Sequence, residues 1–241
     1  MMRQLTQAKW IMMMLTALGL IGGCQPTSRV HVGAFRTWGE MREVMRDGRT
    51  QPRIRLTEIA KANVFGLGAL AGLAGEVTIH EGQIWVSQVR EGRVHTEIRH
   101  DPEDHATLLA AFSMDQWRNV ELNAEMTLSE LEDFIAEARS LNGYAPDMTM
   151  PFMLVGTFEA DVHVVNGACP HADASAPAYR FKIAGDHATA VGYFVENAEG
   201  RLTHHGARTH IHAFVTDPSR QMGHVDAITV RPPATLLIPY E

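Results

Sequence analysis

A period-two alternation of apolar and polar residues is the feature that most constrains the fold of this chain. In "EVTIHEGQIWVSQV" (76–89), Val77 and Ile79 alternate with polar residues, "EG" turns the chain, and Ile84 and Val86 resume the alternation. Residues two apart in a strand point to the same face of a sheet, so this stretch predicts a β-hairpin. The segment "EGRVHTEI" repeats the pattern directly after it.

Further strand patterns fill the second half of the chain, whereas helical patterns are few. The strongest helical segment is "TLSELEDFIAEARSLNG" (127–143), where Thr127 and Glu130 predict a capping box. Shorter helices are expected over 37–48 and 56–63. The expected strands are Phe152–Phe158, Val162–Val165, Tyr179–Ile183, Thr189–Val195, Thr209–Val215, His224–Val230 and Leu236–Ile238.

The Gly-rich, apolar stretch "VFGLGALAGLAG" (64–75) lacks the lysine and the spacing of a phosphate-binding loop. We interpret it as close-packed turns that lead into a strand. No internal repeat or low-complexity segment is visible after residue 24. These patterns predict an α+β fold, a strand-rich single domain over residues 36–241 with mixed or antiparallel sheets and a few helices.

The N-terminal residues have the pattern of an export signal. "MMRQLTQAKW" is basic and contains no acid, and the apolar run "WIMMMLTALGLI" follows it. This run is shorter than the roughly 20 residues that a membrane-spanning helix needs. We therefore expect a signal peptide over residues 1–23 and a tether over residues 24–35.

The end of the expected signal, "LIGGCQ", resembles a bacterial lipobox in which Cys24 is the lipidated residue. Lipid would hold a soluble domain at a membrane surface, so the protein is expected to be exported and anchored at the cell envelope. In a Gram-negative cell, Gln25 after the cysteine indicates the outer membrane or its periplasmic face. The alternative is an ordinary cleaved signal with an incidental cysteine.

Charge and cysteine content exclude two classes of protein. Without residues 1–23 the chain has 19 Lys and Arg against 28 Asp and Glu, a net charge of −9. This balance argues against a nucleic-acid partner, which would need a basic face. Besides Cys24 only Cys169 remains, and a single thiol cannot form an internal disulfide, so the fold must rely on its hydrophobic core.

Three histidines in "THIHAFVTDPSRQMGH" (209–224) could form one metal site. His210 and His212 are two residues apart in a strand pattern, so their side chains project from the same face. Asp-Pro marks a turn, and an antiparallel return could bring His224 beside the pair. Three neutral imidazoles suit zinc and leave a coordination position open. The alternative is a pair of solvent-facing histidines on an edge strand.

Other histidines offer weaker possibilities. Cys169 and His171 in "CPH" could belong to a second zinc site, or Cys169 could be a nucleophile, but a surface loop is the simpler interpretation. His204 and His205 are expected in a turn before the histidine-rich strand. They could support the metal ligands or lie exposed to solvent.

The order of these segments resembles the acetolactate decarboxylase family. The His-x-His pair, a short hairpin and then Gly-His is similar to that family's zinc site. Upstream, "FGLGALAGLAGEVTIHEGQIW" (65–85), "VGTFEADVHV" (155–164) and "ATAVGYF" (188–194) are similar to further family segments in the same order. The resemblance covers roughly residues 31–230.

The resemblance implies a fold, a cofactor and a reaction. Zinc would be held by His210, His212 and His224, with Glu76 nearby. The family removes CO₂ from 2-hydroxy-2-methyl-3-oxobutanoate (2-acetolactate) and gives acetoin, so a small hydroxy-keto acid is the expected substrate. A Lewis acid would stabilise the charge left after loss of CO₂. Glu76 would deliver a proton, or orient a ligand or water.

The chain also departs from the family pattern. The place of the family's arginine falls at Val164, and Arg180 or Arg208 could compensate as substrate-binding residues. The family's C-terminal glutamate has only Glu241, the last residue, as a counterpart. The alternative function is therefore a non-catalytic or differently reacting protein of this fold that binds a metal or a small acid. Exposed strand edges make a homodimer a further expectation.

Overall fold

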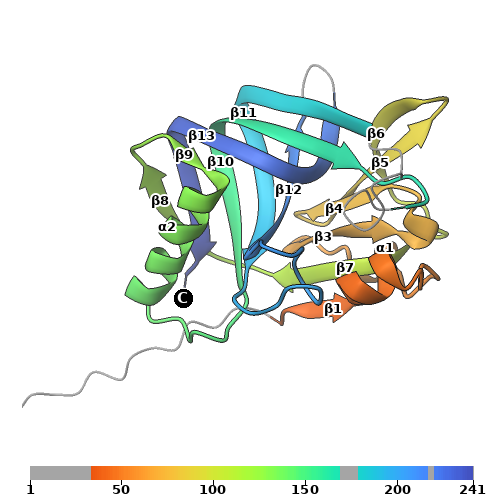
Figure 1. Ribbon diagram of the computed structural model, residues 1–241, viewed down its shortest axis with the longest axis horizontal. Coiled ribbons are helices and arrows are strands. Elements are labelled where there is room, and N and C mark those ends of the chain that lie inside the picture. The colour runs from red at the N-terminus through yellow and green to blue at the C-terminus, as the bar shows by residue number, and fades with distance from the viewer. Residues whose placement is uncertain (1–33, 169–178, 217–219, 241) are drawn as a thin grey trace, which may run out of the picture.

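The computed structural model describes residues 34–168, 179–216 and 220–240, which form two antiparallel sheets (Figure 1). The first sheet has the order β1-β7-β3-β4-β5-β6, and β2 also pairs with β7. Its strands are β1 (Arg36–Trp38), β2 (Ile54–Arg55), β3 (Val64–Leu70), β4 (Glu76–His80), β5 (Gln83–Arg90), β6 (Arg93–Arg99) and β7 (His105–Ser113).

The second sheet contains the long strands of the molecule, in the order β10-β11-β12-β13-β8, with β9 paired to β13. Its strands are β8 (Trp117–Leu122), β9 (Met126–Thr127), β10 (Met150–Val164), β11 (Tyr179–Phe194), β12 (Thr209–Val215) and β13 (Gln221–Pro239). Because β10 also pairs with β13, the strands β10, β11, β12 and β13 close on themselves. A bulge between Gly156 and Phe158 lets β10 bend to reach both neighbours.

The helical elements are short apart from one. They are η1 (Arg42–Arg46), a single π-turn, α1 (Leu56–Ile59), η2 (Ala71–Leu73) and α2 (Leu128–Leu141). In the part of the chain that the structure describes, no helix is long and apolar enough to cross a membrane.

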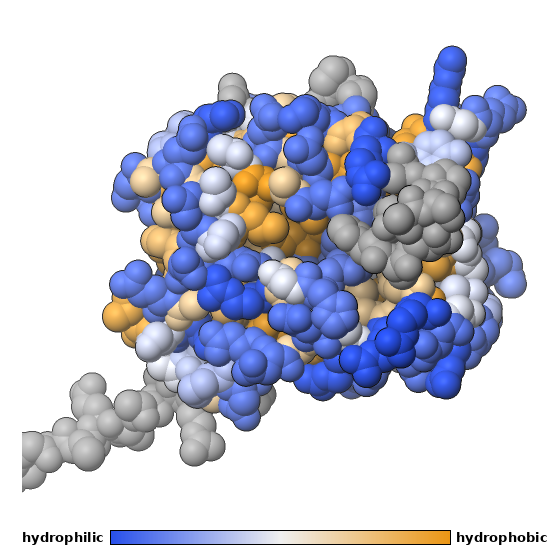
Figure 2. Space-filling model, viewed as in Figure 1, coloured by the Kyte–Doolittle hydropathy of each residue, from blue (hydrophilic) through white to orange (hydrophobic). Residues whose placement is uncertain are grey.

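Apolar side chains of both sheets form buried clusters. One cluster fills the curved second sheet, where Phe152, Ile183 and Ile211 pack with Leu131 and Ile135 of α2. A second cluster joins the two sheets and is made by Phe65, Trp85, Met153, Val191 and Phe214 among others. Figure 2 shows a mostly polar outer face with apolar residues in a hollow near its centre.

Helix α2 holds the start of β12 in place. The predicted capping box is confirmed, because Glu130 accepts from the Thr127 amide at 2.8 Å and Thr127 Oγ1 accepts from the Glu130 amide at 3.5 Å. One turn along, the buried Glu132 carboxylate accepts hydrogen bonds from the Thr209 amide (3.0 Å) and hydroxyl (2.7 Å). The helix therefore fixes the residue that directly precedes His210.

The α+β prediction is confirmed, with antiparallel sheets, and the hairpin over 76–89 is β4 and β5. The interpretation of 64–75 as turns is wrong in its first half. Val64–Leu70 is β3, buried along its whole length between β4 and β7, so the period-two alternation is lost. Gly66 and Gly68 permit this packing, since an added Cβ would collide with carbonyls of β7.

Other boundaries also differ from the sequence expectations. Six of the expected strands merge in pairs into β10, β11 and β13, and β7 and β8 were not foreseen. The expected helix over 37–48 is reduced to η1, because residues 36–38 pair with β7 instead. The expected helix over 56–63 ends at Ile59, where the backbone becomes extended at Ala60.

Gly223, beside the third histidine, lies where β10 and β13 approach each other closely. An added Cβ at Gly223 would lie 2.8 Å from the His163 carbonyl oxygen and 3.2 Å from the Val162 Cβ. We predict that Gly223→Ala lowers the free energy of unfolding by about 1–3 kcal/mol, whereas the exposed control Ala227→Ser changes it by less than about 0.5 kcal/mol. Urea unfolding of both variants measures the difference, and an unchanged stability of Gly223→Ala would contradict the tight-approach argument.

Candidate metal centre

The strand register brings histidines from three strands to one place. His212 of β12 lies directly opposite His224 of β13, and His224 in turn lies opposite His163 of β10. Directly opposed residues on antiparallel strands project to the same face of a sheet. His210 shares that face of β12 because it is two residues from His212. The antiparallel return expected for His224 is therefore present.

His210, His212 and His224 are close enough to share one ion. A ligand nitrogen from each lies within 4.8 Å of the other two, and all three side chains are buried. The ring centroids are separated by 5.3 Å (His210 and His212), 4.8 Å (His210 and His224) and 5.6 Å (His212 and His224). The alternative of solvent-facing histidines on an edge strand is wrong, because both sides of β12 are covered by paired strands.

Hydrogen bonds orient two of the rings. The Tyr193 hydroxyl donates to the Leu202 carbonyl at 2.6 Å, so at 3.0 Å it accepts from Nδ1 of His210. Thr78 Oγ1 of β4 lies 3.0 Å from Nδ1 of His212. With Nδ1 engaged in both rings, Nε2 is the atom left to face the centre, as in histidines that bind metals.

The charge state of the cluster also fits a metal. Burial is the largest cause of the low pKa values: those of His210 and His224 fall well below the ordinary value, and that of His212 falls to about 3. The rings are therefore neutral near pH 7, which a nitrogen ligand requires. Within the described chain, the buried Nε2 of His212 has no hydrogen-bond partner. A buried nitrogen of this kind is costly unless an ion takes the place of a partner.

Glu76 supplies a carboxyl group at the same centre. The residue opens β4, and its Oε2 lies 3.6 Å from Nε2 of His212 while its Oε1 accepts from the Val165 amide at 3.1 Å. Burial raises the pKa of Glu76 to about 8. The metal-free site therefore keeps a proton on this carboxyl at neutral pH. The three imidazoles and Glu76 together could hold a cation and carry a proton.

Residues 40–236 match the family model described as alpha-acetolactate decarboxylase. The chain belongs to the alpha-acetolactate decarboxylase family. Family and fold together support a decarboxylase, which is a lyase. No curated protein matches this chain.

Solved structures share the fold at low sequence identity. Alpha-acetolactate decarboxylase from Bacillus subtilis strain 168 has a TM-score of 0.66 at 17% identity, covering 85% of this chain and 83% of that one. Acetolactate decarboxylase from Bacillus subtilis subspecies spizizenii gives 0.67 at 19%, covering 86% of each. A Staphylococcus aureus protein of unknown function, similar to alpha-acetolactate decarboxylase, gives 0.66 at 17%, covering 85% and 84%.

His163 is a fourth histidine of the centre, and the sequence patterns do not predict it there. Its ring centroid is 4.9 Å from that of His224, and its Nδ1 donates to Asp226 Oδ1 at 2.8 Å. Val164, where the resemblance places an arginine, is fully buried. His163 reaches the centre because β10 pairs with β13 in this register, and no local sequence pattern predicts that register.

The two candidate arginines have different surroundings. Arg180 lies opposite His163 on β11, and its guanidinium contacts Asp226 at 3.3 Å, at the edge of the centre. Arg208 instead contacts Glu132 (3.4 Å) and Asp133 (2.7 Å) of α2. These contacts attach β12 to the helix and lend no support to the expectation that Arg208 binds substrate.

Of the two neighbouring histidines, His204 lies beside the centre, with its ring centroid 5.0 Å from that of His224. His205 is exposed and lies 3.3 Å from Glu199. The predictions for Cys24, Cys169, His171 and Glu241 lie outside the described residues.

The raised pKa of Glu76 gives a pH-dependent signature in metal-free protein. Between about pH 4.5, its ordinary pKa, and pH 8, the folded carboxyl keeps a proton that the unfolded chain releases. Rising pH therefore destabilises the fold through this group, by up to about 1.4 kcal/mol per pH unit. Glu76→Gln removes that dependence, while the contributions of the histidines remain in both proteins.

We predict that the stability of Glu76→Gln relative to wild type increases from pH 5 to pH 8 and is constant above that. Urea unfolding of both proteins in the presence of a chelator, at four pH values, measures the difference. A difference that is the same at every pH would show that Glu76 titrates normally.

Proposed function

We propose that this protein is a zinc-dependent decarboxylase that converts 2-acetolactate, or a closely related chelating hydroxy-keto acid, to the corresponding hydroxy-ketone. The observation that carries this proposal is the convergence of His210, His212 and His224 on a point beside the Glu76 carboxyl. Membership of the alpha-acetolactate decarboxylase family supports the reaction class.

The donor set favours zinc among the common divalent cations. Three neutral imidazoles are typical zinc ligands, whereas magnesium and calcium prefer oxygen. When bound, zinc would act as a Lewis acid on the ketone and hydroxyl oxygens of the substrate and stabilise the charge left by departing CO₂. Three protein ligands leave coordination positions open for those two oxygens. Thr78 and Tyr193 hold the rings of His212 and His210 in the required orientation.

Glu76 is the residue suited to complete the reaction. Cleavage of the carbon–carbon bond releases CO₂ and leaves its electron pair on the hydroxyl-bearing carbon, which then takes a proton. In the metal-free site burial keeps a proton on the Glu76 carboxyl, which lies beside the histidine centre. After the transfer, solvent restores the proton. The Val165 amide holds the other carboxyl oxygen, which fixes the direction of delivery.

Zinc content and CO₂ release test this proposal. We predict about one zinc per chain and CO₂ release from racemic 2-acetolactate. His212→Ala loses both, because a ligand is removed. Glu76→Gln keeps its zinc and loses 10²- to 10⁴-fold in rate, the contribution typical of a positioned proton donor. Arg208→Met serves as the control, with lower stability but normal zinc content and rate.

The departures from the family pattern motivate a second candidate, a protein that binds a metal or small acid without decarboxylating acetolactate. Val164 provides no charge for a substrate carboxylate, and the nearest candidate, Arg180, is already in contact with Asp226. One zinc per chain without CO₂ release would favour this second candidate. Absence of zinc from the wild type would contradict the decarboxylase and leave, of the second candidate, only a protein that binds another metal or a small acid.

The N-terminal pattern adds a proposal about location. We propose that the protein is exported and anchored to the cell envelope through lipid on Cys24, with residues 24–35 as a tether. In a bacterial host, the wild type is then expected in the membrane fraction and Cys24→Ala in the soluble fraction. A wild type that is fully soluble after export would instead support an ordinary cleaved signal. The homodimer also stays a prediction, which light scattering can measure.

A further inference from the structure

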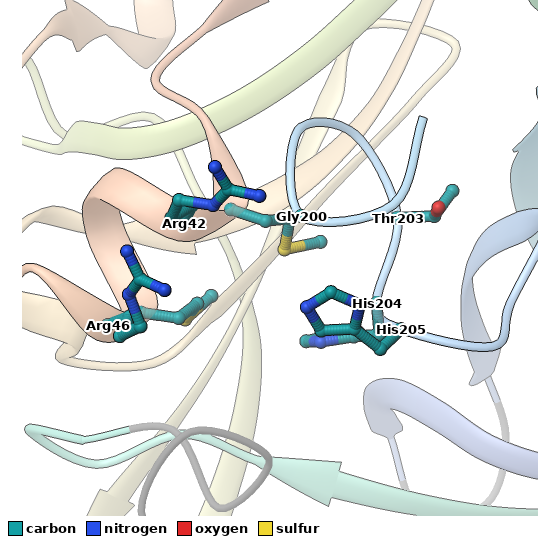
Figure 3. A pocket seen from close by; sticks show the side chains of 8 residues that line it. Arg42, Arg46, Gly200, Thr203, His204 and His205 are labelled. Atoms are coloured by element: carbon teal, nitrogen blue, oxygen red, sulfur yellow. The ribbon is translucent and has the colours of Figure 1, made fainter. Parts of the chain in front are cut away.

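An outer cavity of about 210 Å³ lies beside the histidine centre (Figure 3). One wall comes from η1 and the residue before it, and the other from the loop that precedes β12. Figure 3 shows the side chains of Arg42 and Arg46 on one side and those of His204 and His205 on the other. The lining residues are Met41, Arg42, Met45, Arg46, Gly200, Thr203, His204 and His205.

This outer cavity adjoins the metal centre. Met41, Met45 and His204 line both the outer cavity and a small inner cavity of about 10 Å³. The inner cavity is also lined by Glu76 and His210, together with His163 and His224. A volume of this size holds about one water molecule, so a substrate must come from a larger neighbouring cavity. The outer cavity is one such cavity, and another is lined by His204, His224 and Asp226 among others. The residues of η1 therefore line one approach to the reacting groups.

The position of η1 is fixed by backbone hydrogen bonds to the opposite wall. The Met41 amide donates to the Arg201 carbonyl at 2.9 Å, and the Arg42 amide donates to the Gly200 carbonyl at 2.8 Å. Gly200 has φ +71° and no side chain, and a Cβ there would lie 3.3 Å from Arg42 Nη2. The glycine thus leaves room for the guanidinium at the mouth of the cavity.

The two arginines keep their positive charge at that mouth. Among the described residues, no carboxylate lies within ion-pair distance of Arg42. Arg46 forms an ion pair with its neighbour Asp47, at 3.3 Å, and no other within the described part of the chain, and 69% of its side chain is exposed. The remaining acid of this turn, Glu43, is neutralised by other arginines, Arg49 and Arg53, each at 3.0 Å.

The rest of the molecule has the opposite charge, since the full chain has a net charge of −7. An anionic substrate would be repelled by such a protein unless a local positive field guided it. Guanidinium groups bind carboxylates strongly and do not lose their charge. Attraction of an anionic substrate would therefore explain three observations together. Arg42 and Arg46 line the outer cavity, their charges are exposed, and this cavity shares lining residues with the inner one.

We propose that Arg42 and Arg46 form a cationic entrance that selects small hydroxy-carboxylate anions and guides them to the histidine centre. For the identity of the anion, this inference rests on the proposed function. The two arginines act on capture of the substrate and not on the bond-breaking step. Their removal therefore lowers kcat/KM and leaves kcat unchanged.

The test uses the full chain loaded with zinc and the double variant Arg42→Met/Arg46→Met. At low ionic strength we expect kcat/KM for 2-acetolactate to fall about tenfold, and in 0.5 M salt the difference should shrink below twofold, because salt screens the attraction. The control Arg36→Met/Arg231→Met removes the same net charge from exposed positions that do not line the cavity, and it should behave like wild type.

A binding measurement separates this inference from the proposed function. Calorimetry would compare 2,3-dihydroxy-2-methylbutanoate, a non-reacting anion, with the neutral butane-2,3-diol. We expect the double variant to bind the anion about tenfold more weakly at low salt and the diol equally well. If wild type releases no CO₂ but this pattern appears, the proposed reaction fails and the cationic entrance stands.

Three outcomes would overturn the inference itself. The first is an active wild type whose kcat/KM is unchanged by the double variant at low salt. The second is an equal loss in the Arg36→Met/Arg231→Met control, since the effect would then come from net charge alone. Failure of the wild type to bind the anionic analogue would also contradict a carboxylate entrance.

Discussion

The register between β12, β13 and β10 is the constraint on which the candidate site depends. It places His224 opposite both His212 and His163, although these residues come from three separate strands. A slip of one residue would turn His224 to the other face of the sheet and dissolve the cluster. Closure of β10, β11, β12 and β13 resists such a slip, because each strand is paired on two sides. The site is thus a consequence of sheet closure.

Burial then sets the chemistry of the groups that the register assembles. The same removal from water keeps the imidazoles neutral and the Glu76 carboxyl protonated. Neutral rings can bind a cation, and a protonated carboxyl can deliver a proton. The charges that we propose to attract an anion lie further out, with Arg42 and Arg46 at the mouth of the outer cavity. The proposed proton donor and the proposed attracting charges are therefore spatially separate.

Local patterns in the sequence predict a substantial part of this arrangement. Strand periodicity predicts that His210 and His212 share a face, the turn signal Asp217-Pro218 predicts the return of His224, and the capping box predicts the start of α2. Family resemblance, and not periodicity, singled out Glu76. These features depend on residues close in the chain or on an ordered set of motifs, so one sequence is enough to find them.

What the sequence did not reveal depends on contacts between distant residues. His163 joins the centre through a pairing with a strand about sixty residues away, and Glu132 of α2 binds Thr209 across a similar separation. The buried strand β3 was hidden because both of its faces are apolar. The approach of η1 to the loop at 200–201 is likewise tertiary. Such pairings are set by packing of the whole fold.

The most direct test of the central claim, that the register builds one metal site, is an anomalous difference map from zinc-loaded crystals. The structure predicts a single peak about 2.1 Å from one imidazole nitrogen each of His210, His212 and His224, with Nε2 as the ligand atom of the first two. A peak elsewhere, or one bound by fewer than these three histidines, would contradict the claim.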